Sequence, residues 1–205
     1  MGNTPTSVEF WFDPICPWCW MTSRWASEVA SVRGFDIAWH PISLRIINEN
    51  NPDDSHHEHH VRGHRFGRVV EAARREAGES VVGPLYTAIG TRVHPGERED
   101  VEAIVAESLA EVGIAGEAAQ RIAAEADLET SDAQLRANTA HALEIAGPDV
   151  GVPIISIDGV AFFGPVVTPA PTGDAALRLW DGIHAAASVP GFYELKRGRT
   201  AGPQF

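Results

Sequence analysis

The 205-residue sequence is poor in cysteine, in lysine and in long apolar runs. Its two cysteines are too few for a disulfide-stapled scaffold or for a four-cysteine zinc site. No apolar stretch reaches the roughly 20 residues that a transmembrane helix requires. Basic residues number 16 against 28 acidic ones, which gives a formal net charge of −12. We therefore expect neither nucleic acid nor an anionic membrane among the partners.

The beginning of the chain, MGNTPTSVEFWFDPI, has no basic segment, no long apolar run and no small-residue cleavage site. It lacks the features of a secretory signal peptide, and we expect a cytosolic protein. In that compartment a pair of cysteines serves catalysis or metal binding more often than structure. A structural disulfide is also a weak explanation, because two cysteines three positions apart close almost no loop.

Two short strands separated by a helix are predicted first. SVEFWF, residues 7–12, is short and aromatic, which favours a buried strand. Apolar residues then recur at helical spacing from about residue 16 to Gly34, a residue type that commonly ends a helix. FDIAWHPISL, residues 35–44, alternates apolar with polar residues and predicts a second strand. The helix between the strands makes them parallel, in a right-handed βαβ unit.

Helix-forming residues dominate the middle of the chain. From about Pro52 to Ala146, alanine, glutamate and arginine replace the valine, isoleucine and aromatic residues of the first segment. Glycine and proline punctuate this block and predict about five helices. We place them near residues 55–77, 80–92, 98–112, 115–127 and 131–146.

Strand character returns near the C-terminus. VPIISIDGVAFFGP, residues 152–165, consists of two apolar runs joined by Asp158-Gly159, which is a strong β-hairpin signal. Residues 172–189 then predict a last helix. We expect the locally basic tail that begins at Tyr193 to pack loosely.

This order of elements indicates an α/β protein. It is that of a thioredoxin fold with a helical domain inserted between the βαβ unit and a C-terminal ββα unit. Residues 1–50 and 148–205 are expected to form the thioredoxin-like domain, and residues 51–147 the inserted all-helical domain.

Both cysteines lie in DPICPWCW, where the first strand passes into the helix. The free amide groups and the dipole of a helix N-terminus favour the thiolate form of Cys16. Pro17 suits a first helical turn, where no amide hydrogen is needed. Cys19 lies on the same helix face and can attack a mixed disulfide formed on Cys16. We therefore expect Cys16 to be the nucleophile and Cys19 the resolving thiol of a redox-active dithiol.

A metal site is the alternative for the two cysteines, and it would need further ligands. HHEHHVRGH, residues 56–64, is the obvious source, because His56, His60 and His64 would stack on one helix face. The stretch misses the H-E-x-x-H zinc pattern, since Val61 stands where the second histidine is required. We therefore expect no metal site.

Val152-Pro153 precedes the first strand of the hairpin. Thioredoxin folds place a cis proline opposite the dithiol, and we expect this peptide bond to be cis. The backbone of Val152 would then be free to pair with an incoming peptide or thiol. A trans proline that opens an edge strand is the alternative.

Glu9 lies between apolar residues of the first strand. If its side chain is buried near the dithiol, it would accept the proton of Cys19 when that thiol attacks. If it lies at the start of the strand, it reaches water instead. The sequence leaves both interpretations open.

FWFDPICPWCW together with GVPIISIDGVAFFGP resembles the DsbA-like branch of the thioredoxin superfamily, over nearly the full length of the chain. The C-P-W-C motif, LRIINENN and FYELKRGRT look most like the actinobacterial mycothiol-dependent nitroreductases, also described as DsbA-like mycoredoxins. The resemblance implies a cytosolic reductase that takes electrons from the low-molecular-weight thiol mycothiol, reduces disulfides and activates nitro-aromatic compounds. It implies mycothiol as co-substrate, a small-molecule or disulfide substrate and no tightly bound cofactor. A homodimer is kept as a hypothesis.

The resemblance also carries over to particular residues. The nucleophile, the resolving thiol and the cis proline would be Cys16, Cys19 and Pro153. Trp18 would present an aromatic face to a flat substrate, with Pro17 and Val152 beside it. Asn48 would form a polar wall of the pocket, or would be an ordinary helix-capping residue.

A second branch of the superfamily shares part of the pattern. Kappa-class glutathione transferases and hydroxychromene-carboxylate isomerases have the same E-x-x-x-D spacing, here Glu9 to Asp13. These enzymes carry serine where Cys16 stands, and serine cannot cycle through a disulfide. The two cysteines therefore favour redox exchange over this isomerase or transferase alternative. A redox-switched binding module, in which the helical domain holds a partner, is the third hypothesis.

Overall fold

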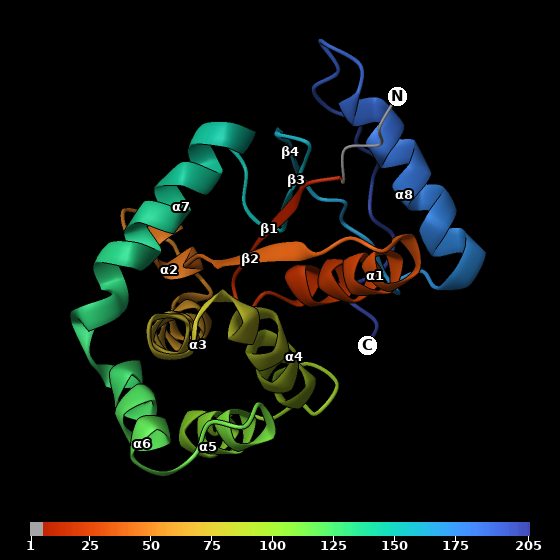
Figure 1. The fold of residues 1–205 in the computed structure, drawn as a ribbon. Helices are drawn as coiled ribbons and strands as arrows, with labels where there is room; N and C mark the ends of the chain where they lie inside the picture. Colours follow the sequence, from red (N-terminus) through yellow and green to blue (C-terminus); the bar gives the residue numbers. More distant parts are fainter. Residues whose placement is uncertain (1–5) are drawn as a thin grey trace.

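The sheet at the centre of the molecule has four strands in the order β2-β1-β3-β4 (Figure 1). The computed structural model describes residues 6–205. β1 (Val8–Phe12) pairs in parallel with β2 (Ile37–Pro41) and antiparallel with β3 (Ile154–Ile157). β3 forms the predicted hairpin with β4 (Val160–Phe163). The parallel pair and the antiparallel hairpin form one mixed sheet, as expected of a thioredoxin fold.

The first helix, α1 (Pro17–Arg33), begins directly after Cys16. Proline at the first helical position supplies a φ angle already suited to a helix, and Gly34 ends the helix with a left-handed φ of 73°. α1 packs against the last helix, α8 (Gly173–Ala187). The indole Nε1 of Trp25 donates to the Ala176 carbonyl over 3.0 Å across this contact. α1 is thus held against α8, and only residues 13–16 separate its first turn from the end of β1.

The second strand ends earlier than predicted, at Pro41 instead of residue 44. Ser43 caps a short helix, α2 (Leu44–Ile47), by accepting a hydrogen bond from the Ile46 amide on its side-chain oxygen. A serine that can cap a helix competes with continuation of a strand. The chain therefore turns away from the sheet at this point.

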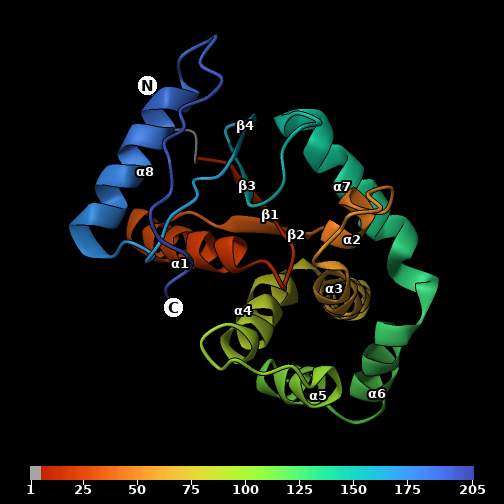
Figure 2. The same cartoon turned by 180° about the vertical axis from the view of Figure 1, so that it is seen from behind.

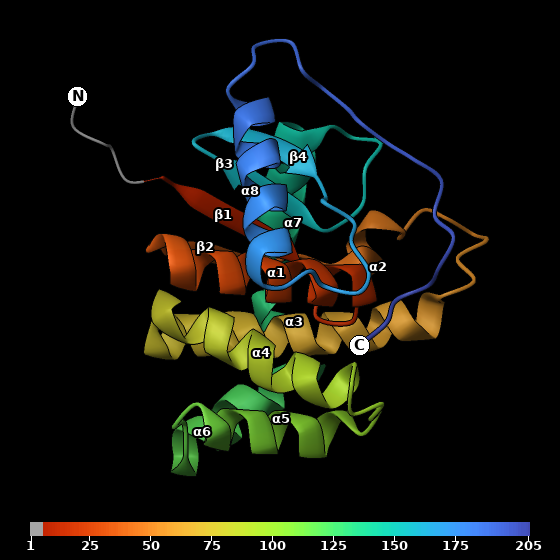
Figure 3. The same ribbon diagram turned by 90° about the vertical axis from the view of Figure 1, so that its right-hand side faces the viewer.

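The inserted helices form two further layers below the sheet in Figure 3, α3 with α4 and then α5 with α6, while α7 runs beside the sheet. Short 3₁₀ turns at residues 79–81, 125–127 and 129–131 join some of them. The helices are α3 (His57–Ala77), α4 (Val82–Val93), α5 (Val101–Glu111), α6 (Gly116–Ala124) and α7 (Asp132–Ala146). Their buried apolar residues join those of the sheet in one continuous cluster. The division into two domains stays a prediction.

The two faces of the sheet meet different helices, as the view from behind also shows (Figure 2). Phe12 of β1 stacks on Tyr86 of α4, with ring centroids 3.8 Å apart, and Trp20 of α1 contacts the same tyrosine. Trp11 points the other way and contacts His141 of α7. Since alternate residues of a strand face opposite sides, odd and even positions of β1 belong to different environments.

The end of the chain returns to the main body instead of packing loosely throughout. We call residues 189–205 the C-terminal strap; Figure 3 shows it running from the end of α8 along one side of the molecule to finish beside α1. Tyr193 and Leu195 are exposed. Farther on, the Oγ1 of Thr168 donates to the Gly202 carbonyl over 3.1 Å and accepts from the Gln204 amide over 2.9 Å. These bonds fix the last residues of the strap.

Among residues 6–205, no helix has the length and apolar character needed to cross a membrane.

Candidate active site

Both cysteines are free thiols at the N-terminal end of α1. Cys16 is the N-cap residue, and its Sγ accepts a hydrogen bond from the Cys19 amide over 3.4 Å. Its thiol also donates to the Val152 carbonyl over 3.8 Å. Cys16 keeps 5% of its surface exposed, whereas Cys19 keeps none. The geometry is that of an outer and an inner thiol, with the outer one held by the helix terminus.

The Val152-Pro153 peptide bond is cis, as predicted. The Cys16 thiol contacts the carbonyl of Val152 itself, and the next carbonyl, that of Pro153, accepts from the Gly164 amide over 2.7 Å. The loop before β3 is therefore tied to the hairpin and faces the dithiol.

Of the two interpretations left open for Glu9, the structure contradicts burial near the dithiol and agrees with a side chain that reaches water. Its side chain is 39% exposed, and its Oε2 lies 3.0 Å from Nε2 of His40. Glu9 occupies the same face of β1 as Trp11, the face toward α7, whereas Phe12 points toward α4 and α1. The strand alternation thus directs Glu9 away from the helix that carries the cysteines.

A buried carboxyl does lie in the loop of residues 13–16 between β1 and α1, which we call the active-site loop, and it belongs to Asp13. Its Oδ1 accepts from the Ile15 amide over 3.0 Å and its Oδ2 from the Leu44 amide over 2.7 Å. Burial raises the pKa of Asp13 from 3.8 to about 6, while these two amide bonds oppose the rise. Asp13 is therefore a buried carboxylate that changes its protonation close to neutral pH.

Cys19 responds to the same environment. Its burial is the largest cause that raises the pKa of this thiol well above the ordinary value, and the adjoining Cys16 and the negative charge of Asp13 raise it further. The pKa of the Tyr86 phenol is raised in the same way, mainly by burial and to a smaller extent by the charge of Cys19. Cys19 is thus a protonated inner thiol that must lose its proton before it can attack a disulfide. Asp13 is the buried carboxylate whose charge acts on this thiol.

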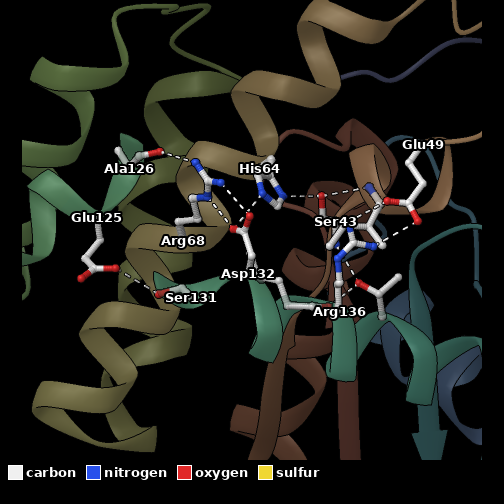
Figure 4. Close-up of polar contacts among 12 residues, drawn as sticks. Ser43, Glu49, His64, Arg68, Glu125, Ala126, Ser131, Asp132 and Arg136 are labelled. Atoms are coloured by element: carbon white, nitrogen blue, oxygen red, sulfur yellow. Dashed lines mark hydrogen bonds and ion pairs between the residues drawn. The ribbon is translucent and has the colours of Figure 1, made fainter. Parts of the chain in front are cut away.

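A polar network supports the turn that supplies the Leu44 amide (Figure 4). The Ser43 hydroxyl lies 2.8 Å from Nδ1 of His64, and Nε2 of His64 lies 3.1 Å from Oδ1 of Asp132. Arg68 holds both oxygens of Asp132, at 2.6 and 2.7 Å. A serine, a histidine and an aspartate linked in series resemble a hydrolytic triad, but Ser43 is completely buried and caps α2. The network therefore joins α2, α3 and α7 and fixes the turn beside Asp13.

Two histidines of the inserted helices hold the active-site loop itself. His59 of α3 places Nε2 3.2 Å from the Ile15 carbonyl, and His94, at the end of α4, places Nε2 3.0 Å from the Pro14 carbonyl. Burial lowers the pKa of His94 from 6.5 to about 4, so that it is a neutral donor at pH 7. Sequence reasoning singles out neither histidine, because their partners lie far away along the chain.

His60 and His64 of the stretch 56–64 have protein partners as well. Nδ1 of His60 lies 2.8 Å from Oδ2 of Asp54, and His64 belongs to the network described above. Within residues 6–205, no three side chains of histidine, cysteine, aspartate or glutamate converge as a group that could hold a metal ion.

Of the residues expected to contact a substrate, Pro17 and Trp18 lie at the start of α1 and Asn48 lies at the end of α2. Trp18 is half-buried, and the guanidinium carbon of Arg199 lies 4.9 Å from its ring centroid. Pro17 begins α1 beside it. Asn48 is the C-cap of α2 and donates its side-chain amide to the Leu44 carbonyl over 2.8 Å, as a capping residue would. The role of these residues toward a substrate stays a prediction.

Several solved structures share this fold. A thiol-disulfide oxidoreductase, MdbA from Corynebacterium diphtheriae, is 16% identical with a TM-score of 0.56, covering 80% of this chain and 80% of its own. A 2-hydroxychromene-2-carboxylate isomerase is 16% identical with a TM-score of 0.62, covering 87% of this chain and 93% of its own. The cytosolic disulfide reductase DsbM from Pseudomonas aeruginosa, solved with GSH, is 18% identical with a TM-score of 0.54, covering 86% and 98%. At these identities the likeness establishes a DsbA-like thioredoxin fold.

Sequence comparison goes further. The uncharacterized protein Rv2286c of Mycobacterium tuberculosis is 34% identical over 200 residues, which cover 95% of this chain and 83% of the relative. The family model called Rv2466c-like, described as mycothiol-dependent nitroreductase Rv2466c, matches residues 15–197. This match begins at the active-site loop and extends into the strap. The chain belongs to this Rv2466c-like family.

Proposed function

We propose that this protein is a cytosolic, mycothiol-dependent reductase that acts on disulfides and nitro-aromatic compounds through Cys16 and Cys19. The observation that carries the proposal is the free dithiol at the N-terminus of α1, facing the cis Val152-Pro153 bond. The family match supports mycothiol as the electron donor. The small exposed fraction of Cys16, 5% against none for Cys19, supports their division into attacking and resolving thiols.

Reduction of a disulfide would then proceed in two exchanges. The Cys16 thiolate attacks one sulfur of the substrate, the substrate S–S bond breaks, and one thiolate leaves. Cys19 next attacks the Cys16 sulfur, forms the Cys16–Cys19 disulfide and releases the second thiolate. Two electrons pass from the protein to the substrate. Two mycothiol molecules restore the dithiol by the same two exchanges in reverse and become mycothiol disulfide.

The resolving step requires removal of a proton from Cys19, whose pKa is raised by burial. Asp13 is a buried carboxylate whose charge acts on Cys19, and its raised pKa of about 6 makes it a useful base near neutral pH. In this proposal Asp13 takes the role that the sequence suggests for Glu9.

A nitro-aromatic substrate would receive the same two electrons. Conversion of a nitro group to a nitroso group consumes two electrons and two protons and releases water, which matches oxidation of one dithiol to one disulfide. The half-buried ring of Trp18 offers a surface on which such a flat molecule can stack.

Turnover with mycothiol tests the proposal. Wild-type protein, Cys16→Ser and Cys19→Ser are supplied with a disulfide or a nitro-aromatic compound, and mycothiol or glutathione serves as electron donor. We expect turnover with mycothiol, complete loss in Cys16→Ser and accumulation of a mixed disulfide in Cys19→Ser. Full activity of Cys19→Ser without a mixed disulfide would instead favour the isomerase or transferase alternative. Oxidation-dependent partner binding without any turnover would favour the redox-switched binding module.

A further inference from the structure

The C-terminal strap carries a positive cluster in an otherwise acidic protein. Lys196, Arg197 and Arg199 fall within four positions, while the whole chain has a formal net charge of −12. All three side chains belong to exposed residues. Among the ion pairs of residues 6–205, none involves these three, so their charges are not neutralised by a neighbouring carboxylate.

The end of the strap is held close to the active-site loop. Beyond Arg199, the Gly202 carbonyl and the Gln204 amide are both bonded to Thr168. The terminal Phe205 packs on His94, with ring centroids 5.5 Å apart. His94 itself bonds to the Pro14 carbonyl and stacks on Trp20 of α1. The strap is therefore anchored beside the loop that carries the dithiol.

Arg199 is the basic residue of the strap that reaches the dithiol motif. Its guanidinium lies over the ring of Trp18, 4.9 Å from the centroid. Trp18 stands between Cys16 and Cys19 in the sequence, and Cys16 is the N-cap of the same helix. A cation over an aromatic face is attracted to it, which keeps the guanidinium at this position while its outer edge stays in water. A positive charge is thus held against the residue that lies between the two cysteines of the motif.

We propose that Arg199 is a specificity-determining residue that favours aromatic substrates with negative charge. The inference rests on the proposed function and adds a substrate class to it. A chain with a net charge of −12 repels anions as a whole, so a local cation beside the dithiol motif is needed to raise their encounter rate with Cys16. Arg199, seated over the Trp18 ring, binds the carboxylate or another anionic group of the molecule, while the aromatic part lies alongside that ring.

Two aromatic disulfides that differ in charge test this proposal. The reduced protein is mixed with 5,5′-dithiobis(2-nitrobenzoate), which carries two carboxylates, or with 4,4′-dithiodipyridine, which is neutral at pH 7. With either probe, Cys16 attacks the S–S bond, forms a mixed disulfide and displaces one aryl thiolate. Cys19 then attacks the Cys16 sulfur, forms the Cys16–Cys19 disulfide and displaces the second aryl thiolate. The second-order rate constant is followed by the absorbance of the released thiol.

We expect Arg199→Gln to lower the rate with the anionic probe by about threefold or more and to change the rate with the neutral probe by less than about twofold. The loss should shrink at ~0.5 M salt, because surface charges are then screened. Arg199→Lys, which keeps the charge, should restore much of the rate. Arg178→Gln, which removes an exposed positive charge from α8, should behave like the wild type with both probes.

An equal loss with both probes would overturn the proposal, because Arg199 would then only order the site. Faster reaction with both probes would also overturn it, since the strap would then merely cover Trp18. If the wild type reacts with neither probe, the dithiol assignment fails, and the inference fails with it. A wild type that reacts with both probes but shows no effect of Arg199→Gln contradicts the inference alone.

Discussion

At the scale of single residues, Asp13 is the side chain on which the proposed chemistry depends most after the cysteines. Each of its two oxygens accepts one backbone amide, from Ile15 and from Leu44. An asparagine in its place would turn one of these acceptors into an amino group that faces an amide hydrogen. A carboxylate is therefore required for the structure of the loop, and the proposed transfer of the Cys19 proton depends on it as well.

We predict that Asp13→Asn slows the release of a mixed disulfide by about 10- to 100-fold, because Cys19 loses its base. The measurement is the rate of release as a function of pH. In the wild type this rate should change around pH 6, where Asp13 titrates, and in the variant this inflection should be absent.

Glu9→Gln is the matched control for Asp13→Asn. Glu9 is a carboxylate of the same strand-loop segment, but its side chain is partly exposed and paired with His40. Its replacement should leave both the rate and the pH profile unchanged. An inflection that disappears in Glu9→Gln and persists in Asp13→Asn would contradict the assignment.

Gly63 of α3 is a second residue that the site requires. A Cβ added there would lie 2.5 Å from Oδ1 of Asp13 and 2.6 Å from Cγ2 of Ile15. We predict that Gly63→Ala lowers the free energy of unfolding by about 1–3 kcal/mol, because the active-site loop must shift away from α3. A Cβ added at Gly182 of α8 would meet no such neighbour within 4 Å, so Gly182→Ala should instead stabilise the helix by about 0.5–1 kcal/mol. Urea unfolding of both variants checks this, and equal effects would argue against the tight packing of α3 on Asp13.

At the scale of elements, the active-site loop is shared between the thioredoxin-like part and the inserted helices. His59 of α3 and His94 of α4 each hold one of its carbonyls, and the Ser43–His64–Asp132 network fixes the α2 turn that bonds to Asp13. The inserted helices thus shape the environment of the dithiol as well as covering it.

Local patterns predict most of the elements well. The Asp158-Gly159 hairpin, the capping Gly34 and the helix that starts at Pro17 are all consequences of turn and cap chemistry within a few residues. The alternating pattern places the end of β2 too late, because it continues past Pro41 while the capping bond of Ser43 already turns the chain into α2.

The site could be predicted only in part, for a physical reason. The roles expected of Cys16 and Cys19 follow from a motif of four residues, and a cis proline follows from the fold. Asp13 and Glu9 are both carboxylates in or directly after β1, and tertiary packing decides that Asp13 is the buried one. Part of that packing comes from Gly63 of α3, which lies far from Asp13 in the sequence. Neither spacing nor composition reports on such a contact.

At the scale of the whole molecule, two buried groups give stability opposite dependences on pH. Asp13 has a folded-state pKa of about 6 against 3.8 when unfolded, so its contribution is full below pH 3.8 and is lost as the pH rises through 6. His94 has a folded-state pKa of about 4 against 6.5, so its contribution is full above pH 6.5 and is lost as the pH falls through 4. Between these limits the two effects oppose each other, each by about 3 kcal/mol.

We predict that single variants separate these effects. In His94→Gln the Asp13 effect remains alone, and stability should decrease relative to the wild type as the pH rises from 4 to 6. In Asp13→Asn the His94 effect remains, and stability should increase more steeply than in the wild type over the same range. Urea unfolding at several pH values provides the test. Parallel curves for the two variants and the wild type would show that neither group is buried as described.

The most direct test of the account is the site of the mixed disulfide. Cys19→Ser and Cys16→Ser are each mixed with mycothiol disulfide, and the modified residue is located by mass spectrometry after digestion. We predict one equivalent of mycothiol on Cys16 in the first variant and almost none on the fully buried Cys19 in the second. Rapid modification of Cys19 in Cys16→Ser, or no adduct on Cys16 in Cys19→Ser, would contradict the assignment of nucleophile and resolving thiol.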